Sequence, residues 1–240
     1  MSFHAPFADT ERLIRSANQA HEMNMMFGHL GGRDLIAVAC RSFGDRLTLV
    51  SSFGAEAAVL LSLAAEVDRN IAVTFIDTGR LFGETLRYRE TLIERLGLTS
   101  VTSVRPDPVQ VKQVDGDMLQ FRRDPGLCCY IRKVEPLQRA LRPYDAWLTG
   151  RKRYQGGARG HMPTIEAADG RLKFNPLADW TRDDIEAHFK RHDLPHHPLE
   201  ADGFLSIGCM PCTDRVAPGE DPRAGRWRDQ DKTECGIHTI

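Results

Sequence analysis

Four of the six cysteines form two pairs whose spacing suits the binding of a metal centre. Cys128 and Cys129 are adjacent in the stretch GLCCYIRK, and Cys209 and Cys212 form a C-x-x-C in GCMPC. Adjacent cysteines must twist to reach a single zinc ion, whereas each can bind a different iron of a four-iron cluster. The spacing favours a metal site and leaves zinc and iron–sulfur open. Alternatively, the adjacent pair packs in the core and only the C-x-x-C pair does redox chemistry.

A fifth cysteine, Cys235, lies in the terminal stretch ECGIH, within polar sequence that lacks apolar periodicity. A cysteine in such a segment is exposed, which suits a nucleophile or a redox thiol better than a core residue. Glu234 would raise the pKa of this thiol, and a protonated His238 would lower it. A terminal thiol without a role is an equally simple interpretation. Cys40, in IAVACRSF, is most simply a small buried apolar residue.

The stretch SSFGAEAAV, residues 51–59, lies where a strand is expected to meet a helix. Hydroxyl side chains and a glycine at such a junction leave backbone N–H groups free at a helix N-terminus, where an anion can bind. The stretch lacks the Gly-Lys-Ser/Thr ending of a Walker loop and the G-x-G-x-x-G of a dinucleotide site. Taken alone, it predicts an ordinary strand–helix turn with Ser51 or Ser52 as the cap.

Basic side chains gather in two glycine-containing segments with poor periodicity. Surface charge explains any one of them, yet arginine forks in loops also match the oxygens of phosphate and sulfate. Lys133 differs, because it lies four residues after Cys129 and so on the same side of a helix, where it could offset the negative charge of a cluster. The loop residues are Arg151, Lys152, Arg153 and Arg159, followed by Arg223 and Arg226.

Two histidine pairs are assigned no role. His188 and His192 have metal-ligand spacing on a predicted helix but lie among charged residues, which indicates a solvated face. His196 and His197 are flanked by prolines and are expected in a loop.

Apolar runs rich in β-formers alternate with helical stretches along the chain. This alternation predicts an α/β fold with a parallel, doubly wound sheet. The predicted strands are residues 46–54, 70–79, 98–106 and 144–152, with a short strand around Leu172–Phe174. The predicted helices are residues 11–43 with Gly44 as the stop, 55–67, 81–97, 128–141 with a kink or early break at Pro136, and 181–194 with Thr181 as N-cap.

Length and composition set further limits. A chain of 240 residues can bury one core, and 41% hydrophobic and 27% charged residues are typical of a soluble globular protein. The formal charge of −1 gives no reason to expect a nucleic-acid or membrane partner, and no apolar stretch approaches a membrane span. The first residues show no signal pattern, so we expect a cytoplasmic protein with reduced cysteines. We expect one domain over residues 1–213 and a mobile, polar tail over residues 214–240.

Taken together, the motifs resemble the assimilatory adenylyl-sulfate/phosphoadenylyl-sulfate reductase family over residues 40–238. The resemblance rests on SSFGAE, FIDTGRLFGET, CCYIRKVEPL, LTGRKRYQ, FNPLADW, GCMPC and ECGIH. It implies a Rossmann-like parallel sheet of the adenine-nucleotide alpha-hydrolase (PP-loop) type. Members that carry both cysteine pairs hold a 4Fe–4S cluster and typically act on adenylyl sulfate, whereas relatives without the pairs use the 3′-phosphorylated substrate.

The resemblance also implies roles for individual residues, carried over by motif position. Cys235 matches the catalytic cysteine, and Lys133 would act against the sulfate of the substrate. The ligands of the 4Fe–4S cluster would be Cys128, Cys129, Cys209 and Cys212. The substrate-binding residues would be Ser51, Ser52 and Gly54 in the phosphate loop, Asp77, Thr78, Gly79, Arg80 and Leu81 along the nucleotide pocket, and Arg159, Arg223 and Arg226 at the anion site.

The implied reaction is the reduction of adenylyl sulfate to sulfite and AMP in sulfate assimilation and cysteine biosynthesis. The Cys235 thiolate would attack the sulfuryl sulfur to form an S-sulfocysteine, from which thioredoxin or glutaredoxin would release sulfite. No thioredoxin-like domain follows the tail, so we expect a separate protein reductant. Phe53 and Ala57 replace a serine and an acidic residue found in many adenylyl-sulfate enzymes. Activity on the 3′-phosphorylated substrate, or on both substrates, therefore stays open.

Two other classes of protein fit parts of the sequence. An iron–sulfur sensor that binds nucleotide without catalysis would need the same cysteines and pocket but no tail nucleophile. A four-cysteine zinc protein that binds RNA through RKRYQGGAR would need a basic balance, which this chain lacks. The sequence does not set the oligomeric state, so a homo-oligomer also stays open.

Overall fold

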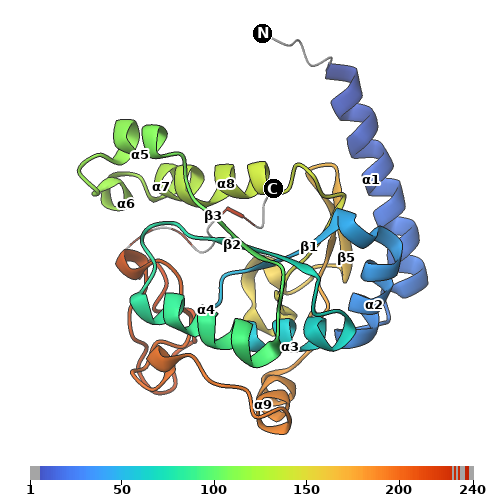
Figure 1. The fold of residues 1–240 in the computed structure, drawn as a ribbon. Coiled ribbons are helices and arrows are strands. Elements are labelled where there is room, and N and C mark those ends of the chain that lie inside the picture. Colours follow the sequence, from blue (N-terminus) through green and yellow to red (C-terminus); the bar gives the residue numbers. More distant parts are fainter. Residues whose placement is uncertain (1–5, 229, 231, 233–235, 238–240) are drawn as a thin grey trace.

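A computed structural model of the chain describes residues 6–228, 230, 232 and 236–237, and its centre is a six-stranded sheet (Figure 1). The strands are β1 Leu47–Ser51, β2 Ala72–Ile76, β3 Val101–Val104, β4 Ala146–Leu148, β5 Ile165–Ala168 and β6 Arg171–Phe174. Their order in the sheet is β3-β2-β1-β4-β6-β5. All neighbours run parallel except β5, which pairs antiparallel with β6 at one edge. The expected α/β fold with a parallel sheet is confirmed.

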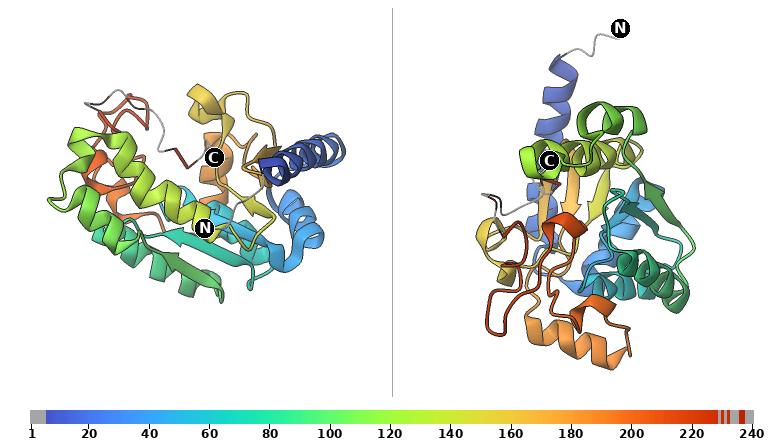
Figure 2. Two further views of the ribbon diagram at one scale, coloured as in Figure 1. Left: turned by 90° about the horizontal axis from the view of Figure 1, so that it is seen from above. Right: turned by 90° about the vertical axis from the view of Figure 1, so that its left-hand side faces the viewer.

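Helices cover both faces of this sheet, which is why its strands are short apolar runs. The helices are α1 Pro6–Phe27, α2 Gly32–Phe43, α3 Ala57–Val67, α4 Gly83–Leu96, α5 Pro108–Asp115, α6 Gln120–Arg123, α7 Pro125–Cys129, α8 Glu135–Ala140 and α9 Arg182–Arg191. α2, α3 and α4 lie on one face with α9 beside α3, and α5 to α8 lie on the other (Figure 1 and Figure 2). α1 packs on β5 and β6. In the core of the sheet, Leu49 of β1 pairs with Val73 of β2 and Leu148 of β4.

The stretch of residues 11–43 forms two helices, where the sequence predicted one. The glycines of GHLGG separate α1 from α2, and Gly32 has a φ of +49°, which side chains with a Cβ rarely adopt. The predicted stop at Gly44 is confirmed. Thr181 is the N-cap of α9, as predicted, and its hydroxyl accepts a hydrogen bond from the Asp184 N–H at 3.2 Å.

The helix predicted over residues 128–141 contains a wider, π-helical turn. This turn, Tyr130–Val134, joins α7 to α8. Pro136 has no N–H to donate to the carbonyl of Arg132, four residues earlier, and its ring crowds that carbonyl. A turn with i→i+5 hydrogen bonds relieves the clash and keeps the chain helical, so the expected kink or break takes this form.

Residues 214–228, the first part of the expected mobile tail, lie against the domain. The Asp214 N–H donates to the Gly225 carbonyl at 2.8 Å, and Trp227 is 4% exposed beside the cysteine-bearing segments. The mobility of the tail stays a prediction, and Cys235 lies outside the described residues.

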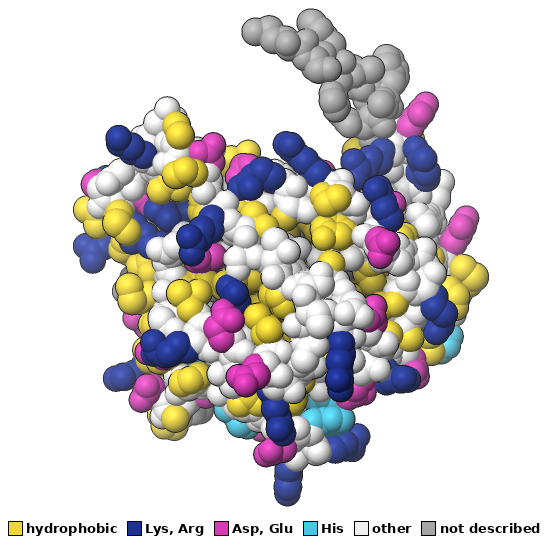
Figure 3. All heavy atoms as spheres, viewed as in Figure 1, with side chains coloured by type: hydrophobic (Ala, Val, Ile, Leu, Met, Phe, Trp, Pro, Cys, Tyr) yellow, Lys and Arg dark blue, Asp and Glu magenta, His cyan; other side chains and the backbone are white. Residues whose placement is uncertain are grey.

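The surface seen in Figure 3 mixes basic and acidic side chains, and neither sign dominates that face. Such a face lacks the continuous basic stripe by which proteins bind nucleic acid. Across the part of the chain that the structure describes, every helix is too short or too polar to cross a membrane.

Candidate active site

A cavity of about 310 Å³ opens at the carboxyl ends of the parallel strands. In the sheet, β1 lies between β2 and β4. The chain leaves β1 toward β2, and the loop after β4 leads to the other side, so the two loops diverge at the end of β1. In open α/β sheets, ligands bind at such a switch point. Ser51 at the end of β1 lines the cavity with Ser52 and Gly54 of the loop that follows, and Thr149 and Gly150 line it from the loop after β4. The predicted phosphate-loop residues therefore share one wall.

Packing fixes the shape of the loop after β1. Phe53 has a φ of +47°, which is costly for a residue with a Cβ. Full burial holds it there, edge-on to Phe75 with 5.3 Å between ring centroids. The Phe53 N–H donates to the Ser51 hydroxyl at 3.1 Å. A Cβ on Gly54 would lie 3.2 Å from the Ile207 carbonyl oxygen, a tight contact that favours glycine at this position.

A buried ion pair forms another part of the cavity wall. Lys152 is 3% exposed, and its Nζ lies 2.6 Å from Glu56 Oε2. The same carboxylate accepts hydrogen bonds from the Tyr154 hydroxyl and, at 3.2 Å, from the Gln155 amide. Burial opposes ionisation of Glu56, but Lys152 and Tyr154 outweigh it and hold the Glu56 pKa below its usual range. Burial also lowers the pKa of Lys152, against the opposing pull of Glu56. The carboxylate thus ties the loop after β4 to the start of α3.

The cavity carries an excess of positive charge. Among the described residues of its wall, six are basic and two are acidic. A concave wall of this kind attracts anions, and guanidinium groups match the oxygens of phosphate and sulfate. Part of the charge is already compensated within the protein, since Arg151 also contacts Glu166. The basic residues are Lys133, Arg151, Lys152, Arg159, Arg182 and Arg223, and the acidic ones are Glu56 and Asp221.

Residues 77–81 connect this cavity to a second pocket. Thr78 and Leu81 line the cavity, and Arg80 lines the second pocket. Asp77 and Gly79 line neither pocket. The Asp77 carboxylate accepts from the Gly79 N–H at 3.1 Å and from Arg105 at 2.9 Å. Asp77 therefore stabilises the turn, and the residues on either side of that turn face the two pockets.

The four paired cysteines all line the second pocket, which we call the cysteine pocket. Cys128 and Cys129 come from the end of α7, and Cys209 and Cys212 come from the loop around the short 3₁₀ helix Met210–Cys212. All four are buried, with exposed fractions of 7–9%. Two segments far apart in the sequence therefore bring their sulfur atoms to one place.

This donor set fits a metal centre that binds thiolates. Burial and neighbouring sulfur atoms raise the pKa of Cys128 to about 12 and that of Cys212 to about 11. Burial also opposes ionisation of Cys209, but Lys133 and a 3.2 Å contact with Thr78 Oγ1 outweigh it and lower the Cys209 pKa. Crowded buried thiols keep their protons unless a cationic metal centre binds in place of those protons. Zinc and iron–sulfur centres both accept four cysteine ligands.

Lys133 lies in the walls of both pockets and extends from the π-helical turn. Its neighbour Arg132 is buried, donates to the Asp115 carboxylate at 2.7 Å and donates to the Thr78 carbonyl at 2.8 Å. Burial opposes ionisation of Asp115, but the Gln120 N–H and Arg132 outweigh it and lower the Asp115 pKa. Arg132 therefore ties the π-helical turn to α5 through Asp115 and to the loop after β2 through the Thr78 carbonyl.

The three arginines predicted at the anion site occupy different places. Arg159 is 8% exposed and lines the cavity, as does Arg223. Arg226 lies beside the cysteine pocket, where its guanidinium stacks on Trp227 at 4.4 Å and its Nε donates to the Cys212 carbonyl at 3.3 Å. The role of Arg226 at the substrate stays a prediction, and its observed contacts support the loop that carries two cysteines.

The predicted nucleophile, Cys235, lies outside the described residues, but Gly236 and Ile237, which follow it, are described. A Cβ on Gly236 would lie 3.3 Å from Val134. Ile237 lines the cavity and packs against the cluster that contains Val50. The described end of the chain therefore reaches the cavity.

Sequence analysis omitted several residues of the cavity wall from the predicted site. The stretch LTGRKRYQ carried a usable signal, because it follows a strand and so meets the edge of the sheet where SSFGAE lies. Arg182 gave no such signal, since it starts a helix far along the chain. The omitted residues include Glu56, Thr149, Gly150, Tyr154, Gln155 and Arg182, whereas Arg151 and Lys152 were named only as basic loop residues that could meet an anion.

The chain is similar in sequence to known proteins. A model of the phosphoadenosine phosphosulfate reductase domain matches residues 46–215. An adenosine 5′-phosphosulfate reductase of Chelativorans sp. (strain BNC1) is 47% identical over 222 residues, which cover 92% of this chain and 91% of the relative. A protein of the same name from Mesorhizobium japonicum is 46% identical, with 92% and 88% covered. A phosphoadenosine 5′-phosphosulfate reductase of Gloeobacter violaceus is 43% identical, with 85% and 87% covered.

Solved structures share the fold. A phosphoadenylyl-sulfate reductase from Candida auris, in a phosphate complex, has a TM-score of 0.69 at 24% identity and covers 82% of this chain and 96% of its own. An FMN adenylyltransferase of Candida glabrata has a TM-score of 0.53 at 14% identity, with 88% and 77% covered. At these identities the likeness establishes the mixed α/β fold with its mostly parallel sheet.

Proposed function

Because this chain belongs to the phosphoadenosine phosphosulfate reductase family, we propose that it reduces adenylyl sulfate to sulfite and AMP with a dithiol protein as reductant. The observation that carries the proposal is that an anion-attracting cavity and a four-cysteine pocket meet at Lys133. The relatives at 46–47% identity, both named adenosine 5′-phosphosulfate reductases, support the choice of substrate. The reaction would take place in the cytoplasm, where thioredoxin and glutaredoxin are kept reduced.

The charge of adenylyl sulfate suits the cavity, since the molecule carries a phosphate and a sulfate. A thiolate that approaches this substrate meets repulsion of about 4 kcal/mol per pair of unit charges at ~4 Å, for an effective dielectric near 20. Lys133, Arg159 and Arg223 line the cavity and would offset that repulsion. The same cations would stabilise the charge that grows on the leaving phosphate.

We assign the nucleophile to Cys235. Its thiolate would form a bond to the sulfuryl sulfur while the bond from that sulfur to the phosphate oxygen breaks, and AMP would leave with the electron pair. A thiolate of thioredoxin or glutaredoxin would then attack the Cys235 sulfur and release sulfite. The second thiol of the reductant would resolve the mixed disulfide, so one dithiol becomes one disulfide per sulfite formed. The position of Ile237 in the cavity wall, two residues after Cys235, supports this assignment.

We infer that the cysteine pocket holds a 4Fe–4S cluster through Cys128, Cys129, Cys209 and Cys212. When bound, the cluster would supply a structural tie between α7 and the 209–212 loop, because the dithiol already supplies both electrons. Lys133 would then be held at a fixed place between the cysteines and the sulfate. Arg132, through Asp115 and the Thr78 carbonyl, positions the helix that carries Lys133.

A second candidate substrate is the 3′-phosphorylated nucleotide. The Gloeobacter relative at 43% identity is named a phosphoadenosine 5′-phosphosulfate reductase, and Phe53 stands where many adenylyl-sulfate enzymes carry serine. A nucleotide-binding iron–sulfur sensor would use the same two pockets without turnover.

The test is sulfite release from both sulfonucleotides, with reduced thioredoxin supplied and the protein purified without oxygen. We expect turnover of adenylyl sulfate and little turnover of the 3′-phosphorylated form. The reverse preference would establish the second candidate, and binding without sulfite release would establish the sensor. Iron and sulfide analysis of the same sample distinguishes an iron–sulfur centre from zinc.

A further inference from the structure

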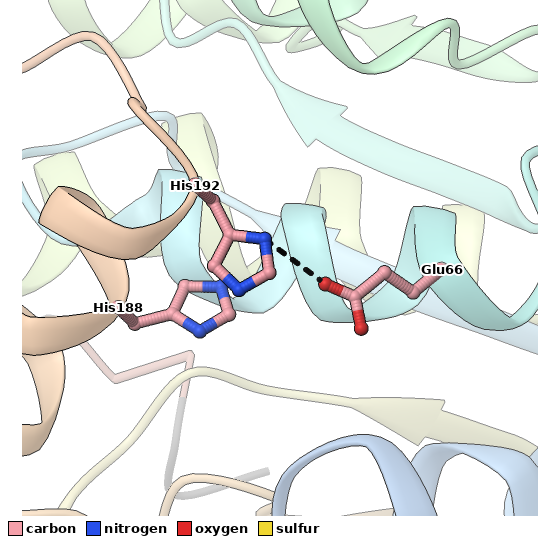
Figure 4. A group of neighbouring side chains, drawn as sticks. All are labelled: Glu66, His188 and His192. Atoms are coloured by element: carbon pink, nitrogen blue, oxygen red, sulfur yellow. Dashed lines mark ion pairs between the residues drawn. The ribbon is translucent and has the colours of Figure 1, made fainter.

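Two histidines and a glutamate form a cluster away from both pockets, on the outer side of α3. His188 and His192 extend from α9, and Glu66 extends from α3 (Figure 4). Each offers one ligand atom, and the three atoms lie within 4.8 Å of one another. Sequence analysis expected both histidines on a solvated face, and for His188 that is wrong, because its exposed fraction is 5%. The packing of α9 on α3 causes the difference.

The three side chains already make contacts with one another or with their neighbours. The His192 Nδ1 lies 3.5 Å from Glu66 Oε1. The His188 Nε2 lies 3.3 Å from the Ser62 hydroxyl, and its ring stacks on His192 with 4.1 Å between centroids. Trp180 packs edge-on against His188 at 5.6 Å. Contacts on several sides therefore hold the His188 ring in the gap between the two helices.

Small movements would complete a metal site. Bonds of about 2.0–2.1 Å in a tetrahedral site set ligand atoms ~3.3 Å apart. The His192 and Glu66 ligand atoms, 3.5 Å apart, are close to that spacing. Rotation of these two partly exposed side chains would bring all three ligand atoms to it. Histidines four residues apart on a helix share one face, which is a common way to bind zinc.

The space beside the cluster would admit a hydrated metal ion. A hollow of about 260 Å³ adjoins the cluster and is lined by Glu66 and His192, so water can reach the site. Arg69 and Arg95 line the same hollow, and Arg95 is paired with Asp193 at 3.1 Å. The Glu66 carboxylate supplies the negative charge, and two neutral imidazoles add no opposing charge.

We propose that Glu66, His188 and His192 bind a divalent transition-metal ion of the zinc class, with water as the fourth ligand. The site ties α9 to α3 and is separate from the chemistry at the cysteines. Nitrogen and oxygen donors with one open position suit zinc, and cobalt(II) can report on the same geometry.

The test uses the anaerobically purified holoenzyme, freed of loosely bound metal and titrated with Zn²⁺ by calorimetry and with Co²⁺ by visible absorbance. We expect one equivalent to bind, with the spectrum of nitrogen and oxygen ligands and no thiolate-to-cobalt charge-transfer band. Glu66→Gln and His192→Gln should each weaken binding at least about 100-fold, beyond the roughly 10–100-fold cost of losing a second-shell partner.

His196→Gln is the matched control, since His196 is also an exposed histidine beside a carboxylate, 3.2 Å from Glu200. It should bind metal like the parent protein. All three variants change side chains at the surface, so their circular dichroism and sulfite release should be unchanged. Equal binding by parent, Glu66→Gln and His192→Gln, a thiolate band, or no binding at all would overturn the site and leave the cluster as a packing contact between two helices.

Discussion

The cavity and the cysteine pocket share a wall at Lys133 but differ in what their side chains require. In the cavity, Glu56 and Lys152 form an ion pair within the protein, and the remaining charge favours an anion. In the cysteine pocket, Cys128 and Cys212 have raised pKa values, because burial and neighbouring sulfur disfavour thiolates. The cavity is therefore preformed, whereas Cys128 and Cys212 would become thiolates only with a bound metal centre. Substitutions in the cysteine pocket should therefore change the iron content and the visible spectrum, whereas substitutions in the cavity should change nucleotide binding.

The largest effect should come from Cys209→Ser, which removes one proposed ligand. We expect loss of iron and of visible absorbance, and a fall in sulfite formation greater than the roughly 100-fold cost of losing a second-shell partner. Cys40→Ser is the control, because Cys40 lies outside the pocket. A Cys209→Ser protein with full iron content would remove the distinction between the two pockets.

Lys152→Met should come next, since it leaves the Glu56 carboxylate without the cation of its ion pair. We expect a loss of about 3 kcal/mol in the free energy of unfolding, together with weaker nucleotide binding, but an unchanged visible spectrum. Urea denaturation and AMP binding measure the two effects. Adding Glu56→Gln should restore most of the stability but not the binding. A change in the spectrum of the single variant would show that the pockets depend on each other.

Lys133→Ala tests the shared wall. We expect a 10–100-fold lower kcat/KM for adenylyl sulfate, or about 1.4–2.7 kcal/mol of transition-state stabilisation, with iron content retained. Lys190→Ala, an exposed lysine on α9, is the control and should have no effect. An unchanged rate for Lys133→Ala would remove its proposed role against the sulfate.

The smallest effect concerns His197, which supports the cavity through Thr85, a wall residue 3.1 Å away. Burial lowers the His197 pKa to about 4, below its value of about 6.5 in the unfolded chain. Its contribution to stability is therefore complete above pH 6.5 and falls as the pH drops toward 4, by about 1 kcal/mol between pH 7 and 5.5. His197→Gln should flatten this part of the stability curve, whereas His196→Gln should not. Parallel curves for parent protein and His197→Gln would contradict the linkage.

The sequence predicted the parallel strands because each is an apolar run followed by a helical stretch, but it did not predict β5. That strand is short and lies at the edge of the sheet, so its burial alternates weakly. A signal was nevertheless present in Asp169–Gly170, since both residues have positive φ and Asp-Gly is typical of a two-residue hairpin turn. Local turn chemistry would therefore have found the antiparallel edge.

Some residues of the candidate site were likewise predicted from the sequence, and others were not. Motif position predicted the loop serines and the cysteine quartet, because these residues lie on contiguous stretches. It omitted Lys152, whose burial depends on Glu56 almost a hundred positions earlier. It also placed His188 in solvent, because helix periodicity alone does not show which neighbouring helix covers a face. Contacts of this kind arise from tertiary packing, which local pattern does not encode.

The π-helical turn makes the length of one segment matter as much as its composition. Side chains on a regular helix advance by about 100° per residue, so the wider turn holds one residue more than an α-helix would between the cysteines and Pro136. Deleting a single position from Tyr130–Val134 would remove the extra residue and favour a regular helix, in which the Pro136 ring would again crowd the carbonyl four residues before it. Lys133 lies inside the turn and would lose the place that it holds between the cavity and the cysteine pocket. Insertions and deletions here should be tolerated less than most single substitutions.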